Sequence, residues 1–391
     1  MALRVPGGVV FRSVVVALFV GACAWPAAAQ RPAPKTDQKP DASAQAQALA
    51  QQQEIQNLVR IADTAMSGQP APAEFPIQFQ NDFLKAQGGR VWVPITLTVD
   101  PAKLTSSALT LYLRVVPRGM TAPPAAAAPT PAAQGKDGKD KDKDKDKKKD
   151  GKGAPAAAPA GPAYPFEDAS FMDLKPAGPG QPLRVARGIG VPSGSYDLYI
   201  VLHERLAAAA APAAGAGTPA GGKTSVLKQP LDVPNYASGE FAASSVILAE
   251  RVDQLATPIT PDQQSERPYA FGPTEIVVAP DKKFKKAQEL IVLLQIYNPM
   301  LTPEKKFTLE ATYTFYRQDG GTEKRFNSTE PQTLTADTMP PGFDPAGGSI
   351  QAGQGVALQS FPEGAYRLEI KVTDKLSAKV LTQNVNFTVT P

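Results

Sequence analysis

The chain has 391 residues, enough for two or three domains, and its one cysteine, Cys23, excludes a fold held together by disulfides within the chain. Its formal net charge of +4 comes from Arg4 and Arg12 near the start and from a Lys/Asp run at 136–153, so the remainder is close to neutral. A near-neutral chain lacks the positive field that attracts a phosphate backbone, which argues against a nucleic acid partner.

The first 29 residues are typical of a secretory signal peptide. Arg4 and Arg12 precede an uncharged, mostly apolar run at 13–25, and a Pro-Ala-Ala-Ala-Gln segment follows. This order predicts cleavage after Ala29 and export to the periplasm or beyond. The run is too short to span a bilayer, and no later segment approaches the roughly 20 apolar residues that a span needs. The alternative is a lipoprotein signal, because residues 20–23 (Val-Gly-Ala-Cys) resemble a lipobox in which Cys23 would be acylated.

Residues 30–69 are predicted to form a disordered segment and then an amphipathic helix. The stretch at 30–40 is rich in Pro, Lys and Gln, and a helix is expected from residue 41 to about Met66, with Gly68 and Pro70 as stop signals. One apolar stripe recurs at helical spacing through Ile55, Leu58, Val59, Ala62 and Met66. We favour a helix docked on its own β-domain over a coiled coil that binds a partner.

A first β-sandwich is expected over 75–235. Apolar and polar residues alternate at 91–99 and again at 109–115, the period of strands with one buried face. Two low-complexity blocks, at 119–162 and 206–222, are too poor in large apolar residues to pack and are predicted to be disordered loops. Without them the segment has about 100 residues, the size of one immunoglobulin-like sandwich.

A second β-sandwich is expected over 240–391, because part of the first segment recurs there. Residues 191–200 align with 361–370, and in each copy a Pro-x-Gly-x-Tyr turn leads into an alternating strand. Alternating strands also occur at 307–315 and 385–389. Two tandem units of the same fold account for this repeat.

The Gly-x-Tyr-x-Leu segments at Tyr196 and Tyr366 resemble the tyrosine corner of immunoglobulin-like and fibronectin type III-like sandwiches. The stretch at 361–389 is also similar to immunoglobulin-like modules of uncharacterised exported bacterial proteins. The resemblance implies that each tyrosine hydroxyl bonds to nearby backbone. The chain departs from the family in two respects: it has no cysteine pair, and Trp92 falls on the polar face of its strand. The expected fold class is therefore all-β: two tandem antiparallel Ig-like β-sandwiches with an N-terminal helix and long disordered insertions.

Three patterns suggest chemistry, and none indicates a site. Residues 217–224 match the phosphate-binding pattern GxxxxGK[ST], but a strand pattern at 225–230, ended by Pro230, follows where a helix is required. His203 is the only histidine, which excludes sites with several histidine ligands. Aspartates at 140–146 alternate with lysines, which cancel the negative field that calcium needs. We therefore predict no catalytic, cofactor-binding or metal-ligating residues and no cofactor.

The sequence favours a non-enzymatic binding or scaffolding protein of the bacterial envelope or secreted space, whose partner is an unidentified protein or an envelope polymer. The alternative is an accessory domain pair of a carbohydrate-acting system, or a cryptic hydrolase. A cleft rimmed by aromatic side chains and a carboxylate pair would favour the alternative, and a smooth sandwich surface would favour the scaffold.

Overall fold

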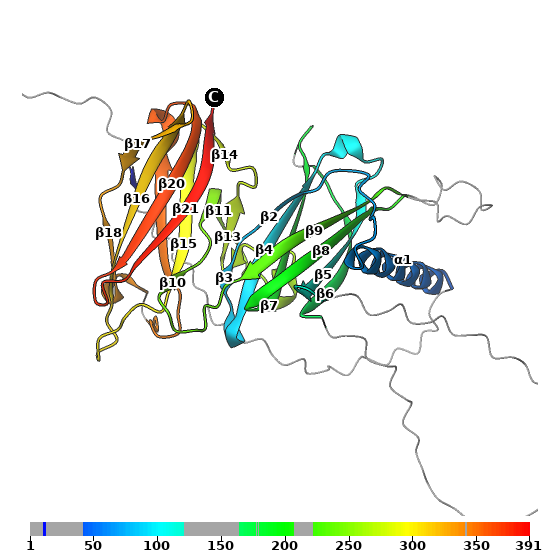
Figure 1. The fold of residues 1–391 in the computed structure, drawn as a ribbon, viewed down its shortest axis with the longest axis horizontal. Coiled ribbons are helices and arrows are strands. Elements are labelled where there is room, and N and C mark those ends of the chain that lie inside the picture. The colour runs from blue at the N-terminus through cyan, green and yellow to red at the C-terminus, as the bar shows by residue number, and fades with distance from the viewer. Residues whose placement is uncertain are drawn as a thin grey trace, which may run out of the picture.

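The structure, a computed structural model, describes residues 11–12, 42–120, 164–176, 178, 180–206, 222–340 and 342–391. These residues form mostly strands and one long helix (Figure 1), which confirms the all-β fold class. Most of the predicted signal peptide, including Cys23 and Ala29, lies outside the described residues, as do nearly all of the two low-complexity blocks.

The strands between residues 78 and 233 form two antiparallel sheets around one core. The strands are β2 (Gln78–Asn81), β3 (Leu84–Lys85), β4 (Arg90–Val99), β5 (Ala108–Pro117), β6 (Phe166–Asp173), β7 (Leu183–Pro192), β8 (Gly194–Glu204) and β9 (Thr224–Val233). One sheet has the order β6-β5-β8-β9, and in the other β4 pairs with β2 and β3 and also with β7. Apolar side chains from β4, β5 and β8 meet between the sheets, so the predicted strands at 91–99 and 109–115 are confirmed.

The strands from residue 242 onward form a second pair of sheets around a separate core. The elements are β10 (Ala242–Ala243), β11 (Ile247–Gln254), α2 (Pro261–Gln264), β12 (Ala270–Phe271), β13 (Thr274–Val278), β14 (Lys283–Lys285), β15 (Glu289–Tyr297), β16 (Thr308–Asp319), β17 (Thr322–Ser328), β18 (Gln332–Thr335), β19 (Ile350–Ala357), β20 (Gly364–Asp374) and β21 (Val380–Thr390). One sheet runs β19-β15-β11-β13-β12, and the other runs β14-β21-β20-β16-β17. A short strand, β1 (Phe11–Arg12), pairs with the outer edge of β19.

The two units repeat the same strand register. In the first unit Tyr196 lies opposite Pro117 and Glu204 lies opposite Leu109, on paired strands β8 and β5. In the second unit Tyr366 lies opposite Arg317 and Asp374 lies opposite Leu309, on β20 and β16. The sequence repeat therefore corresponds to a repeat in the pairing of the central strands.

Helix α1 (Ala42–Met66) packs on the outer face of the sheet that contains β5 and β8. Leu58 and Ala62 are fully buried against Tyr112 and Val201. This contact confirms the helix docked on its own β-domain. Residues 45–53 of the same helix are exposed, because they extend beyond the sheet (Figure 1).

Trp92 joins the two sandwiches. It points away from its own core and packs, with Leu84, against an apolar face of β11, β13 and β15. Its indole Nε1 donates a 2.9 Å hydrogen bond to the carbonyl of Pro268. A Cβ on Gly188 would lie 2.0 Å from the Trp92 ring, so only glycine fits at that position. The face of β4 that the sequence pattern marks as polar is therefore buried by the second sandwich.

Candidate functional site

The two tyrosines singled out by sequence stand at one end of each sandwich. The Tyr366 hydroxyl donates a 2.7 Å hydrogen bond to the carbonyl of Pro362, and its ring stacks on Phe387. The Tyr196 hydroxyl lies 3.4 Å from the carbonyl of Ser193, a long contact. Gly194 has a φ of 151°, and a Cβ there would lie 3.0 Å from the Tyr196 hydroxyl. These side chains close the turns that lead into β8 and β20.

At the opposite end of each sandwich a buried carboxylate holds two loops together. Asp374 is fully buried and accepts hydrogen bonds from the backbone N–H of Met300 at 2.8 Å and of Leu376 at 3.0 Å. The Ser377 hydroxyl donates a third, at 2.7 Å. Asp374 thereby fastens the β15–β16 loop to the β20–β21 hairpin.

Glu204 has the same role in the first sandwich. It is 1% exposed and accepts hydrogen bonds from the backbone N–H groups of Thr105 and Ser106 in the β4–β5 loop. The N–H of Lys223, at the end of the β8–β9 connection, donates to it at 3.2 Å. Neither Glu204 nor Asp374 is among the residues predicted from the sequence. Extending the aligned repeat by four positions would have placed Glu204 opposite Asp374, eight residues after each tyrosine.

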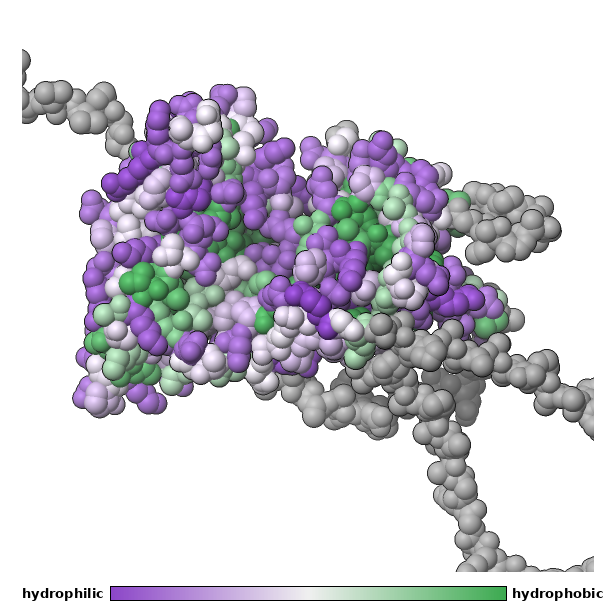
Figure 2. All heavy atoms as spheres, in the orientation of Figure 1, coloured by the Kyte–Doolittle hydropathy of each residue, from purple (hydrophilic) through white to green (hydrophobic). Residues whose placement is uncertain are grey.

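Three apolar side chains project from the loops that Asp374 holds. Met300, Leu376 and Val380 are 53%, 41% and 48% exposed, and they are three of the five large hydrophobic residues exposed in the described part of the chain. Hydrophobic surface gathers at this end of the second sandwich, next to the β20–β21 hairpin (Figure 2). We call Met300, Leu376 and Val380 the apolar tip.

A hollow of about 520 Å³ adjoins the apolar tip through the β15–β16 loop. Glu304 and Lys305 of that loop line one part of it, and residues between β18 and β19 line the rest: Ala336, Asp337, Met339, Pro340, Gly342, Phe343, Asp344 and Pro345. Lys305 Nζ lies 4.0 Å from the Asp344 carboxylate across the hollow. The hollow therefore combines one aromatic ring with three carboxylates and one ammonium group.

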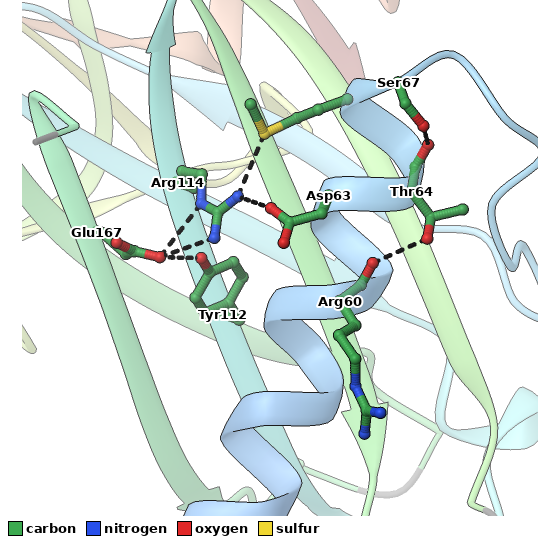
Figure 3. A network of polar contacts seen from close by, with 8 residues as sticks. Arg60, Asp63, Thr64, Ser67, Tyr112, Arg114 and Glu167 are labelled. Carbon is green, nitrogen blue, oxygen red and sulfur yellow. Dashed lines mark hydrogen bonds and ion pairs between the residues drawn. The ribbon is translucent and has the colours of Figure 1, made fainter. Parts of the chain in front are cut away.

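A second polar cluster lies between α1 and the first sandwich (Figure 3). Arg114 of β5 is 2% exposed, pairs with Asp63 of α1, and lies 2.9 Å from Glu167 of β6. Its guanidinium also lies 4.4 Å from the centre of the Tyr164 ring. Burial opposes the charged form, but the hydrogen bonds that Arg114 donates to Asp63 and Glu167 outweigh it and raise the pKa of Arg114. The cluster clamps the helix onto the sheet.

His203 and Lys223, which belongs to the phosphate-loop pattern, both form hydrogen bonds within the first sandwich. His203 Nδ1 lies 2.8 Å from the Thr224 hydroxyl, and burial lowers the pKa of its imidazole. Lys223 Nζ donates to the carbonyl of Lys103 at 2.6 Å. Thr224 begins strand β9, so no helix follows the pattern, and residues 217–221 lie outside the described residues.

The predicted end of this strand at Pro230 is wrong. Strand β9 continues through Pro230 to Val233. It is an edge strand, where proline is tolerated because its missing N–H can face away from the ladder.

Within the ranges that the structure describes, no three His, Asp or Glu side chains are grouped to hold a metal ion. The aspartates at 140–146 lie outside these ranges. The described helices include none that combines the length and the apolar character needed to cross a bilayer.

Comparisons with known proteins leave the family open. No family model matches the chain, and no curated protein matches it. Among solved structures it is similar to a calcium-binding mutant of beta-glucuronidase 2 from Bacteroides uniformis, at 12% identity and a TM-score of 0.22. The match covers 80% of this chain and 33% of the enzyme, so the chain spans about a third of that protein. A likeness at this TM-score carries no argument about activity.

Proposed function

We propose that the protein is an exported, non-enzymatic binding protein of the bacterial envelope or secreted space, and that it recognises its partner with the apolar tip and the adjoining hollow. The observation that carries this proposal is the anchoring of the tip by Asp374. This buried carboxylate binds the backbone of Met300 and of Leu376, while both side chains remain exposed.

Rigid presentation of apolar side chains favours binding. Exposed apolar side chains lower the solubility of a protein, and a cluster of them on the surface often marks an interaction site. Loops already held in one conformation lose less entropy when a partner docks. Three connections, β15–β16, β18–β19 and β20–β21, contribute to this end of the second sandwich. In antibody variable domains, loops gathered at one end of the sandwich form the recognition surface.

The use of polar side chains supports a non-enzymatic role. Glu204 and Asp374 accept hydrogen bonds from loop backbone, and Arg114 clamps α1. His203 is bonded to Thr224 at the end of its strand. Each of these groups makes contacts that hold the fold together, which supports a structural role for them.

Export is part of the proposal and rests on the sequence of residues 1–29. We expect a mature N-terminus at Gln30, which intact mass measurement of protein recovered from cells would establish. An acylated Cys23, detected by metabolic fatty-acid labelling, would instead make the protein a membrane-anchored lipoprotein.

The binding proposal is tested by photo-crosslinking in intact cells. A photoreactive residue at position 376 should give adducts with one or a few envelope components. The same residue at Thr322, an exposed position at the start of β17, serves as the control. Met300→Glu should reduce the adducts from position 376 at least fivefold. Equal adducts from both positions, or no effect of Met300→Glu, would overturn the proposal.

The hollow favours carbohydrate as the second candidate class of ligand. Its lining by Phe343, Glu304, Asp337 and Asp344 combines an aromatic ring with carboxylates. Binding to soluble cell-wall polysaccharide that Phe343→Ala abolishes and Met300→Glu leaves intact would favour an accessory role in a carbohydrate-acting system.

A further inference from the structure

One sheet edge of the second sandwich lacks the residues that usually oppose strand addition. An edge strand exposes unpaired N–H and C=O groups, and proteins block unwanted pairing there with charged residues or proline. Among described edge strands of seven residues or more, β6, β7, β9 and β17 each carry at least two charged residues. Strand β19, with the sequence IQAGQGVA, carries neither a charge nor a proline; of the other described edge strands of this length only β21 shares this, and β14 covers its last three residues. Nothing in the sequence of β19 opposes the addition of a further strand.

The structure shows how this edge is paired. Strand β1 lies antiparallel along it, with Phe11 opposite Val356 and Arg12 opposite Gly355 (dark blue in Figure 1). The inner edge of β19 pairs with β15 over eight residues. The outer edge therefore accepts a strand in a defined direction and register.

The side chains of β19 leave room for such a strand. Ile350, Ala352 and Val356 point into the core. On the other face, Gly353 and Gly355 lie opposite Leu293 and Ile291 of β15 and add no side chain. Glycine weakens a strand, and it often marks a place where another backbone approaches closely.

We propose that β19 accepts, from another polypeptide, an extended and largely apolar segment that adds as an antiparallel strand in the place of β1. This inference rests on the expected cleavage after Ala29, which would remove β1 and expose the outer edge. Main-chain hydrogen bonds would supply affinity, and an apolar side chain opposite Val356 would supply specificity. The site is separate from the apolar tip, so either can fail without the other.

The test uses a synthetic fluorescent peptide with the sequence of residues 8–16 (GVVFRSVVV). Fluorescence anisotropy should show binding to a chain that begins at Gln30, and at least tenfold weaker binding to the full chain, whose own β1 competes. A peptide with proline in place of Val10 and Arg12 lacks two N–H donors and should bind at least tenfold more weakly. Gly355→Lys should weaken binding similarly, whereas Thr322→Lys, away from this edge, should not.

A photoreactive group at the position of Phe11 in the peptide should crosslink next to Val356, as located by mass spectrometry. Crosslinks elsewhere, equal binding of the proline peptide, or no binding to a folded chain from Gln30 would overturn the proposal. If the chain from Gln30 does not fold alone, peptide added in trans should restore the fold, and failure to do so would equally overturn it. Leu376→Glu should leave peptide binding unchanged, which separates this site from the apolar tip.

Discussion

The carboxylate of Asp82, in the first sandwich, accepts a 2.6 Å hydrogen bond from the hydroxyl of Tyr269 in the second, and both side chains are buried. Burial raises the pKa of Asp82 to about 6, although the hydrogen bond from Tyr269 and the charge of Lys282 act against this rise. The junction between the sandwiches therefore contains a group that titrates near neutral pH.

Stability should rise on acidification because of Asp82. Its pKa is about 6 in the folded protein, against an ordinary value of 3.8 that applies to the unfolded chain. Between pH 3.8 and pH 6 the folded state therefore binds more protons than the unfolded state. The free energy of unfolding contributed by this group should therefore fall as pH rises from 4 through 6, by about 3 kcal/mol in all. Urea unfolding at several pH values from 4 to 7.5 measures it.

Asp82→Asn is the control for this pH dependence. The amide oxygen can still accept from Tyr269, but the side chain no longer titrates. The difference in unfolding free energy between the original chain and the variant should change across pH 4 to 6 and level off above pH 7. A constant difference over the whole range would show that Asp82 keeps an ordinary pKa.

The two tyrosines should differ in what their hydroxyls contribute. Tyr366→Phe removes a 2.7 Å hydrogen bond and should cost about 1 kcal/mol, and Tyr196→Phe should cost less because its contact is 3.4 Å long. Tyr→Ala at either position should cost about 3 to 5 kcal/mol, since it also leaves a cavity. Tyr199, on the opposite face of its strand, should tolerate Phe. Urea unfolding that finds Tyr199→Phe the most damaging of the three Phe variants would contradict this assignment.

Asp374→Ala should destabilise the second sandwich by about 2 to 4 kcal/mol, because three donors lose a buried acceptor. It should also speed proteolysis within the β15–β16 loop. Glu310→Gln is the matched control: it breaks a partly exposed ion pair with Lys375 at the same end and should cost less than 1 kcal/mol. Equal effects of the two variants would mean that Asp374 does not organise the loops.

Removing both partners of Arg114 should release α1. The double variant Asp63→Ala, Glu167→Ala leaves a buried cation unpaired and should cost about 2 to 3 kcal/mol, moderated because both carboxylates are partly exposed. Arg114→Met removes the charge itself and should cost less. Limited proteolysis of α1 measures its release, and thermal unfolding measures the loss of stability. A larger loss of stability in Arg114→Met than in the double variant would contradict this interpretation.

Periodicity predicted the parts of the fold that depend on one strand or helix at a time. The alternation at 91–99 and the stripe on α1 each correspond to a buried face, since burial of apolar surface dominates local patterning. The repeat at Tyr196 and Tyr366 likewise corresponds to equal strand registers.

Features that depend on contacts between distant segments could not be predicted in this way. Trp92 occupies a polar alternation position, because its partners, such as Ile276, belong to a separate sandwich. The sequence repeat can place Asp374 and Glu204 at equivalent positions, but it cannot show that they are buried, because a charged residue at a strand end is usually exposed. They are buried because loops fold over them, so their burial can be read only from the tertiary structure.

The shared register of β5 with β8 and of β16 with β20 is what duplication of one ancestral sandwich would leave behind. A buried acid occupies the same register in both copies, as Glu204 and as Asp374, while the segments beside it differ. A long Ala/Gly/Pro block follows Glu204 in the sequence, whereas a hairpin of a few residues follows Asp374. A variant in which the β8–β9 and β20–β21 connections are exchanged would show whether partner binding depends on the short hairpin.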